Sequence, residues 1–167
     1  LLSNSSGTND ASFSSNYNYF INTHSDANNP FIITLNDNKG KLLKVLEDNK
    51  SLLNKMNDFD LVEKIFFSIP TDNNIDLNAW IMKPELLDTN KKHPLLIYVY
   101  GGPGINTVNN AWSWMNYFWF QYLVKQGFVV VSVDNRGTGY RGKEFKHATY
   151  LQLGKLETED QIDAAIH

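Results

Sequence analysis

The sequence predicts an α/β fold preceded by an antiparallel β meander, and three observations carry this prediction. Two continuous apolar runs of strand length, 94–100 and 128–133, are separated by an amphipathic segment of helical length. This pattern is typical of a strand, a crossover helix and a parallel strand in a sheet covered on both faces. A glycine-rich turn, 101–104, follows the first run, at the place where α/β folds carry their chemistry. The residues before position 47 instead form short apolar stretches between polar turns.

The amino-terminal region is predicted to contain three short strands, at 17–22, 31–35 and 41–46. Polar turn compositions separate them, at 25–30 and 36–40. Strands at this spacing form an antiparallel meander, such as a blade of a β-propeller or part of a barrel. Three strands complete neither a propeller nor a barrel, so we expect that an amino-terminal part of this domain is missing from the sequence. A free-standing β module is the alternative.

A short helix or linker is expected at 48–58, where Leu52 and Met56 lie at helical spacing. We place a domain boundary at its end. The chain then divides into an amino-terminal β region, 1–58, and a carboxyl-terminal α/β region, 59–167.

The α/β region is predicted to open with a hairpin, strands 62–69 and 75–82 around the turn 70–74. The crossover helix is predicted over 111–126, with Gly127 ending it in the left-handed conformation. Its apolar stripe is expected to consist of Trp112, Met115, Trp119, Tyr122 and Leu123. Phe118 and Phe120 lie off this stripe, which indicates either a second buried face or a helix buried all round.

A further helix is predicted to begin at the capping box of residues 158–161, Thr-Glu-Asp-Gln. We expect the acidic residues there to be helix-start charges and a solvated face; the set is Glu157, Glu159, Asp160 and Asp163. A right-handed α/β unit delivers its next parallel strand after such a helix. The chain ends before that strand.

Composition excludes several classes of protein. The net charge is −3 from 18 acidic and 15 basic residues, so no basic footprint for nucleic acid is present. The absence of cysteine excludes disulfides, thiol catalysis and thiolate zinc sites. No apolar run reaches the length of a membrane span. The chain begins at Leu1-Leu2 without methionine, and we expect it to be a cut piece of something longer.

Motifs for cofactors and metals are weak. Residues 137–142 match G-x-G-x-x-G, but three residues separate them from the strand end, and no phosphate-loop lysine follows 101–104. The four histidines show no ligand spacing. A nucleophile elbow, G-x-S-x-G, is absent from the sequence. We therefore expect no cofactor and no metal, and these residues alone form no catalytic centre.

Three ordered motifs carry a family resemblance: Tyr-Val-Tyr-Gly-Gly-Pro at 98–103, Asp-Asn-Arg-Gly-Thr-Gly-Tyr-Arg-Gly at 134–142, and Leu-Gly-Lys-Leu-Glu-Thr-Glu-Asp-Gln at 153–161. They resemble the prolyl oligopeptidase family of serine peptidases, and most closely its dipeptidyl peptidase IV branch. The resemblance implies a fragment: the last blade of a β-propeller, then an incomplete α/β-hydrolase sheet truncated before the nucleophile elbow.

The resemblance also implies a role for Tyr100. In the family, the tyrosine before the Gly-Gly-Pro turn donates its hydroxyl in the oxyanion hole, a reasonable use of an O–H held at a strand end. We expect Tyr98 to be an ordinary strand aromatic, and Asp134 and Arg136 to pin the loop rather than touch substrate. The family's nucleophilic serine, aspartate and histidine have no counterpart among these residues.

The expected function is that of a dipeptidyl peptidase fragment acting on peptide substrates, the fragment itself being inactive. The parent cuts dipeptides, often after proline, from free amino termini, and is expected to form a homodimer. The family analogy favours the periplasm or cell surface. The alternative is a non-catalytic, peptidase-like scaffold whose serine is lost. An oligopeptidase or acylaminoacyl peptidase branch is a third possibility.

Overall fold

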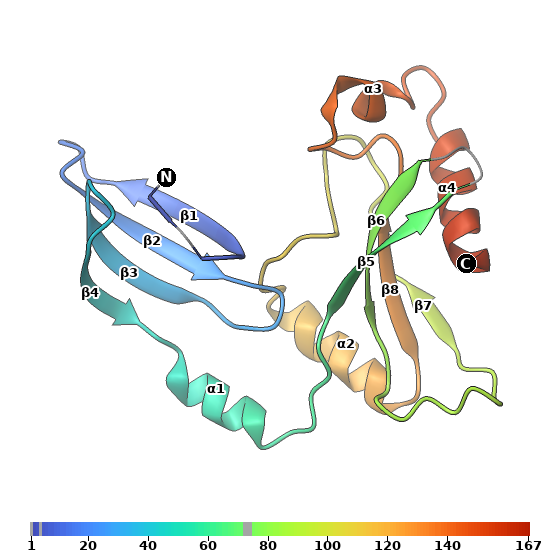
Figure 1. Ribbon diagram of the computed structural model, residues 1–167, viewed down its shortest axis with the longest axis horizontal. Coiled ribbons are helices and arrows are strands. Elements are labelled where there is room, and N and C mark those ends of the chain that lie inside the picture. The colour runs from blue at the N-terminus through green and yellow to red at the C-terminus, as the bar shows by residue number, and fades with distance from the viewer. Residues whose placement is uncertain (1, 4, 72–74) are drawn as a thin grey trace. The chain divides into compact units, whose positions relative to one another are not determined.

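The computed structural model describes residues 2–3, 5–71 and 75–167. The chain forms two compact units (Figure 1). The first contains Leu1–Leu61 and Asn110–Trp119, and the second contains Val62–Asn109 and Phe120–His167.

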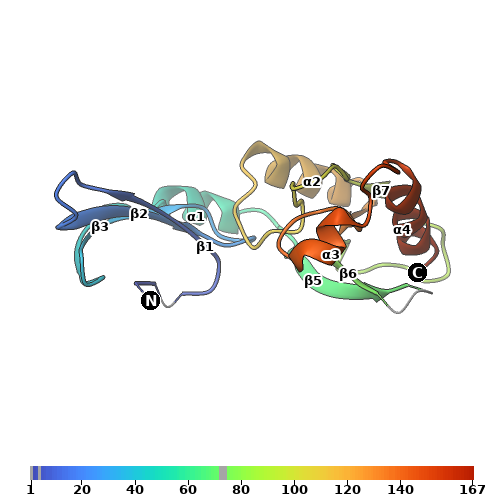
Figure 2. The ribbon, with the colours of Figure 1, turned by 90° about the horizontal axis from the view of Figure 1, so that it is seen from above.

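The first unit contains a four-stranded antiparallel sheet in sequential order, β1-β2-β3-β4 (Figure 1). Figure 2 shows β1, β2 and β3 of this sheet from above. The strands are β1 (Thr8–Phe13), β2 (Tyr19–Ser25), β3 (Ile32–Asp37) and β4 (Leu42–Glu47). The predicted meander is confirmed, but the prediction of three strands is wrong because β1 was missed. Its sequence, Thr-Asn-Asp-Ala-Ser-Phe, is largely polar and exposed, so pairing with β2 holds it in place rather than an apolar face.

Side chains in the predicted turns explain why the strands reverse where they do. The Asp26 carboxylate accepts hydrogen bonds from the backbone amides of Asn28 and Asn29, both at 2.8 Å. The Asp37 carboxylate accepts from the amides of Lys39 and Lys41, both at 2.9 Å. These aspartates satisfy turn amides that have no strand partner.

The core of the first unit lies beside α1 (Lys50–Asn57), in the region where a helix was expected. Residues 110–119 return to this unit and supply part of that core. Trp112 and Tyr117 are buried with Met56, and their ring centroids are 4.3 Å apart. The backbone amide of Trp112 also donates to the Ser25 hydroxyl, at 3.2 Å. A segment distant in sequence thus completes the packing.

The second unit is built on a mixed sheet in the order β5-β6-β8-β7. Its strands are β5 (Ile65–Pro70), β6 (Asp76–Met82), β7 (Leu95–Ile97) and β8 (Val129–Asp134). The β5–β6 pair is the predicted hairpin, and residues 72–74 of its turn lie outside the described residues. β7 and β8 pair in parallel, with Leu95 opposite Val129. The predicted parallel unit is therefore confirmed.

Apolar clusters cover both faces of this sheet. One contains Trp80, Met82, Phe120, Leu123, Val124 and Val130, and it joins the sheet to the second half of α2 (Met115–Lys125). The other contains Ile69, Leu77, Ala79, Val131 and Val133, packed against Phe145 and Ala164. Those two residues lie in α3 (Gly142–His147) and α4 (Lys155–Ile166). A four-strand meander followed by an α/β sheet covered on both faces confirms the predicted fold class.

The buried face of α2 differs from the predicted stripe. Met115, Trp119 and Tyr122 are more than half exposed. Leu123 is buried as predicted, and so is Trp112, which precedes the helix; the other buried positions of α2 are Tyr117, Phe120, Gln121 and Val124. Aromatic and apolar residues fill nearly every position of this helix, so spacings of three and four fit more than one phase. Gly127 does adopt a left-handed backbone after the helix, with φ of 88°.

The start of α4 also differs from the prediction. The helix begins at Lys155, and Glu157 accepts a hydrogen bond from the backbone amide of Gly154 at 2.9 Å. Gly154 has a φ of 86°, a conformation that costs glycine little. The acid that reaches back to the start of the helix is therefore Glu157, one turn before the predicted box.

Candidate active-site segment

Tyr100 lies just beyond the carboxyl end of β7. The ladder with β8 extends past Ile97, since the Tyr98 amide donates to the Val131 carbonyl at 2.8 Å. The Ser132 hydroxyl donates to the Tyr98 carbonyl at 2.6 Å. Tyr100 is 59% exposed. A strand fixed up to position 98 thus presents a tyrosine at its end.

The two glycines after Tyr100 matter for different reasons. Gly101 has a φ of 75°, which residues with a side chain rarely adopt. At Gly102 a β-carbon would lie 2.9 Å from Cε1 of Tyr100, so the phenol ring packs directly over this glycine. A side chain at position 102 would therefore displace the ring from this position.

Tyr100 lines a cavity of about 540 Å³. The turn residues 99–103 form one wall, and Asn135 lies in the lining. The opposite wall consists of α4 and the residues before it: Leu153, Gly154, Glu157, Thr158, Gln161, Ile162 and Ala165. Most of the polar groups in this wall already have partners: Glu157 accepts from the Gly154 amide, and the Thr158 hydroxyl donates to the Gly154 carbonyl. A phenol O–H in this setting can donate to a negatively charged oxygen.

Tyr98 packs as a strand aromatic, as expected. Its ring meets Phe120 edge-on, with centroids 5.2 Å apart and an interplanar angle of 63°. Phe120 in turn contacts Trp80 in the core. The two tyrosines of the motif therefore have different surroundings: Tyr98 packs against α2, whereas Tyr100 lines the cavity beside α4.

Asp134 pins the loop that follows the glycine-rich turn, which confirms that expectation. Its carboxylate is buried and accepts hydrogen bonds from the Thr107 amide at 2.8 Å and from Asn106 Nδ2 at 2.9 Å. The Val108 amide lies 3.3 Å from both carboxylate oxygens. Such a set of donors satisfies a buried carboxylate without a cation. Asp134 is therefore a structural residue of the loop 101–109.

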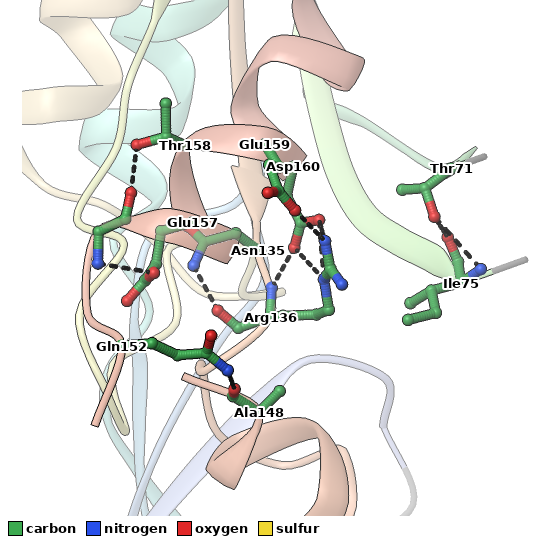
Figure 3. Close-up of polar contacts among 11 residues, drawn as sticks. Thr71, Ile75, Asn135, Arg136, Ala148, Gln152, Glu157, Thr158, Glu159 and Asp160 are labelled. Atoms are coloured by element: carbon green, nitrogen blue, oxygen red, sulfur yellow. Dashed lines mark hydrogen bonds and ion pairs between the residues drawn. The ribbon is translucent and has the colours of Figure 1, made fainter. Parts of the chain in front are cut away.

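Arg136 is held by a buried ion pair with Asp160 (Figure 3). The guanidinium Nη2 donates to Asp160 Oδ1 at 2.6 Å, and Nε donates at 2.9 Å to the same oxygen. The backbone amide of Arg136 donates to Asp160 Oδ2 at 2.6 Å. These hydrogen bonds raise the pKa of Arg136 above its ordinary value. The prediction that Arg136 pins the loop is confirmed.

The expected role of Asp160 as a solvated charge is wrong, because the residue is fully buried. The interpretation failed because an acid in the first turns of a helix is usually exposed and favoured by the helix dipole. Here the partner is Arg136, 24 residues earlier in the sequence. Glu159 fits the expectation better, since it is 47% exposed and lies 3.6 Å from Nη2 of Arg136.

The match to G-x-G-x-x-G is explained by packing. A β-carbon at Gly137 would lie 2.8 Å from Oγ1 of Thr149, and the Gly137 amide donates to the Phe145 carbonyl at 3.0 Å. Gly142 begins α3, which has only six residues. Gly137 therefore allows close approach of Thr149, whereas Gly142 faces open space and has a φ of 87°.

Two residues that hold the site were not predicted. The Asn135 carboxamide donates to the Gly101 carbonyl at 3.1 Å, and Gln161 Nε2 donates to Asn135 Oδ1 at 3.1 Å. Neither belongs to a local pattern, because each partner lies 26 or more residues away in sequence. Only the folded arrangement reveals them.

Among residues 2–3, 5–71 and 75–167, no three His, Cys, Asp or Glu side chains gather as a metal site would require. The helices in this same part of the chain are too short or too polar to cross a membrane.

Comparisons with known proteins relate the chain to one family. Residues 114–167 match the model of the prolyl oligopeptidase family. A probable dipeptidyl peptidase 4 of Aspergillus flavus is 36% identical over 158 residues, which is 93% of this chain and 20% of that protein. The chain thus spans about a fifth of the length of the curated relative it matches.

Solved structures agree with the sequence comparisons. The crystal structure of Porphyromonas gingivalis dipeptidyl peptidase 4 matches 99% of this chain and 23% of its own, at 43% identity and a TM-score of 0.92. A putative dipeptidyl aminopeptidase IV from Bacteroides ovatus matches 96% of this chain and 22% of its own, at 28% identity and a TM-score of 0.80. This chain therefore belongs to the prolyl oligopeptidase family.

Proposed function

We propose that this chain is a segment of a longer serine-type dipeptidyl peptidase, which releases amino-terminal dipeptides of the X-Pro type through an acyl-enzyme. In this proposal the segment contributes Tyr100 to the oxyanion hole. The observation that carries it is the position of Tyr100: at the end of β7, over a glycine turn and in a cavity. Similarity to dipeptidyl peptidase 4 proteins over nearly the whole chain supports it.

The proposed role requires Tyr100 to donate a hydrogen bond to the carbonyl oxygen of the substrate. When a serine attacks a peptide carbonyl, the carbonyl oxygen becomes negative, and a hydrogen-bond donor placed beforehand stabilises it. The Tyr100 hydroxyl is such a donor, and it is worth about 10²–10³ in turnover by analogy with other oxyanion-hole donors. The serine, its histidine and the orienting aspartate come from parts of the longer protein outside these 167 residues.

The domain assignment is part of the same proposal. Residues 1–58 are the carboxyl-terminal part of a β-propeller with its linker, and residues 59–167 are the amino-terminal part of the α/β-hydrolase domain. The four-strand meander supports the first assignment, since propeller blades are four-stranded antiparallel sheets. The parallel β7–β8 pair supports the second. The partners are peptides, and the longer protein is proposed to be a homodimer.

The test uses the full-length protein with an X-Pro dipeptide anilide, presented once with a free amino terminus and once acetylated. We expect hydrolysis of the free substrate only, because the activity is directed at free amino termini. The isolated 167-residue chain is expected to show no turnover above background. Turnover by the isolated chain that is lost in Tyr100→Phe would contradict the assignment of the nucleophile to another segment.

The same experiment separates the enzyme from a peptidase-like scaffold. A fluorophosphonate probe labels an activated serine whether or not the chosen peptide is a good substrate. Labelling together with hydrolysis supports the peptidase. A full-length protein that neither reacts with the probe nor cleaves the anilide is a scaffold that has lost its serine.

A further inference from the structure

The carboxamide of Asn135 connects three parts of the second unit. Its Nδ2 donates to the Gly101 carbonyl at 3.1 Å. Figure 3 shows its second bond, to the carbonyl of Arg136 at 2.7 Å. Its Oδ1 accepts from Gln161 Nε2 of α4 at 3.1 Å. Asn135 is fully buried, so these partners replace water. The side chain therefore links the glycine turn to the loop after β8 and to α4.

Only one orientation of this amide satisfies its neighbours. Two carbonyl oxygens, of Gly101 and Arg136, face one end and demand a donor. The other end faces Nε2 of Gln161, which also donates to the Val133 carbonyl at 3.1 Å. Reversing either amide would place oxygen against oxygen. Neither a carboxylate nor a hydroxyl could make all of these bonds.

The neighbours that hold Asn135 are themselves fixed. The next residue, Arg136, donates its backbone amide and its guanidinium to the buried Asp160. Asp160 and Gln161 are adjacent in α4. The helix therefore holds this segment at two points: Asp160 accepts from the backbone amide of Arg136, and Gln161 donates to Oδ1 of Asn135. A side chain anchored in this way can transmit its position to the Gly101 carbonyl.

The Gly101 carbonyl directly follows Tyr100, and the phenol ring packs over Gly102. We propose that Asn135 is a positioning residue, which aims the Tyr100 hydroxyl by holding the Gly101 carbonyl. This inference rests on the proposed oxyanion role of Tyr100. A displacement of about 1 Å at a catalytic group costs on the order of 10²-fold in rate, so the hydrogen bond matters to turnover.

The functional test is a double-mutant cycle in the full-length protein, with Asn135→Asp and Tyr100→Phe. Aspartate has nearly the shape of asparagine, but a carboxylate oxygen replaces Nδ2. An acceptor then faces the carbonyl oxygens of Gly101 and Arg136, and both hydrogen bonds are lost. We expect kcat on an X-Pro dipeptide anilide to fall about ten- to hundredfold, with KM nearly unchanged. The double variant is expected to be no slower than Tyr100→Phe alone, because Asn135 acts through Tyr100. Losses that multiply would overturn the proposal.

Controls separate positioning from folding. Asn54→Asp makes the same chemical change on the exposed side of α1 and is expected to leave kcat and the melting temperature unchanged. If Asn135→Asp does not fold, Asn135→Ala replaces it in the cycle, since it removes the donors without adding a charge. Wild-type turnover in Asn135→Ala would also overturn the proposal.

A second measurement does not depend on activity. Hydrogen–deuterium exchange of the peptide covering 98–104 in the full-length protein is expected to be faster in the Asn135 variants and unchanged in Asn54→Asp. Unchanged exchange in the Asn135 variants would overturn the anchoring of the turn. A wild-type protein without peptidase activity would contradict the proposed function, and the exchange result would still decide whether Asn135 holds the turn.

Discussion

At Gly102 a single hydrogen atom in place of a side chain leaves room for the Tyr100 ring. A β-carbon would lie 2.9 Å from Cε1 of that ring, closer than carbon atoms pack. Gly102 does not have a positive φ, so alanine brings the clash without backbone strain.

We therefore predict that Gly102→Ala lowers kcat of the full-length protein, by up to about 10²-fold if the ring moves by about 1 Å. The melting temperature should change little, because the ring can move into the open cavity. The measurement is steady-state kinetics on an X-Pro anilide beside a thermal melt. Wild-type kcat in the alanine variant would show that the position of the ring does not matter.

Lys64 is a buried cation in the second unit. It is only 5% exposed, and its Nζ lies 4.8 Å from the centroid of the Trp80 ring. Burial lowers the pKa of Lys64 from 10.5 to about 8. Between these two pH values the unfolded chain binds the proton and the folded protein does not. The contribution of Lys64 to stability therefore rises as pH increases from about 8 to 10.5.

We predict that the melting temperature of Lys64→Met relative to wild type falls as pH rises from about 8 toward 10.5. The contribution of the lysine to wild-type stability rises over this range, whereas methionine does not titrate. The measurement is the difference in melting temperature between variant and wild type across this range. A difference that grows with pH would contradict the direction of the pKa shift.

At the scale of elements, a buried ion pair between Arg136 and Asp160 attaches α4 to the loop after β8. Asp160 is fully buried and bonds both the side chain and the backbone of Arg136. Glu159, the preceding residue, lies 3.6 Å from the same guanidinium but is 47% exposed. Asp160 and Glu159 therefore allow a buried and an exposed partner of the same arginine to be compared for their contribution to stability.

We predict that Asp160→Asn destabilises the full-length protein by on the order of 3 kcal/mol, because a buried arginine loses its charged partner. Glu159→Gln is expected to cost less than about 1 kcal/mol, as is usual for an exposed pair. Urea unfolding of the two variants provides the comparison. Equal losses would mean that burial does not distinguish the two acids.

The sequence predicted the elements that carry their own pattern. The parallel pair β7–β8 and the hairpin β5–β6 show apolar runs of strand length, and both were found. β1 was missed because its polar residues are ordered by pairing. The phase of α2 was wrong because an aromatic-rich helix has no unique apolar face. α4 begins earlier than predicted because a glycine precedes it in place of a side-chain cap.

The site shows the same contrast between residues that a local sequence pattern indicates and residues whose partners are distant in sequence. Asp134 and Arg136 were expected to pin the loop by hydrogen bonds and charge, and both do. The partners themselves, Asn106 and Asp160, are 28 and 24 residues away and follow from tertiary structure alone. Asn135 could not be predicted, because no local pattern marks a buried amide. The oxyanion role of Tyr100 stays a prediction.

At the scale of the whole molecule, the described residues expose an unpaired sheet edge and apolar side chains. β7 is the last strand in the order of its sheet, with one side unpaired among the described strands. Met115 of α2 is 79% exposed, and Tyr100 borders an open cavity. Bare sheet edges and apolar surface favour association.

We predict that the isolated chain aggregates or binds a hydrophobic dye such as ANS, measured by light scattering and dye fluorescence. The full-length protein at equal concentration is the control and should do neither. A soluble monomer with a sharp, cooperative melt and no dye binding would contradict this expectation.

The most direct measurement of the central claim is kcat of the full-length protein after removal of one hydroxyl group. Tyr100→Phe should lower kcat on an X-Pro anilide by about 10²–10³, with little change in KM, because the bond forms in the transition state. Tyr98→Phe removes the same group two residues away and keeps the packing against Phe120, so its kcat should stay near wild type. Equal kcat values for wild type and Tyr100→Phe would contradict the account.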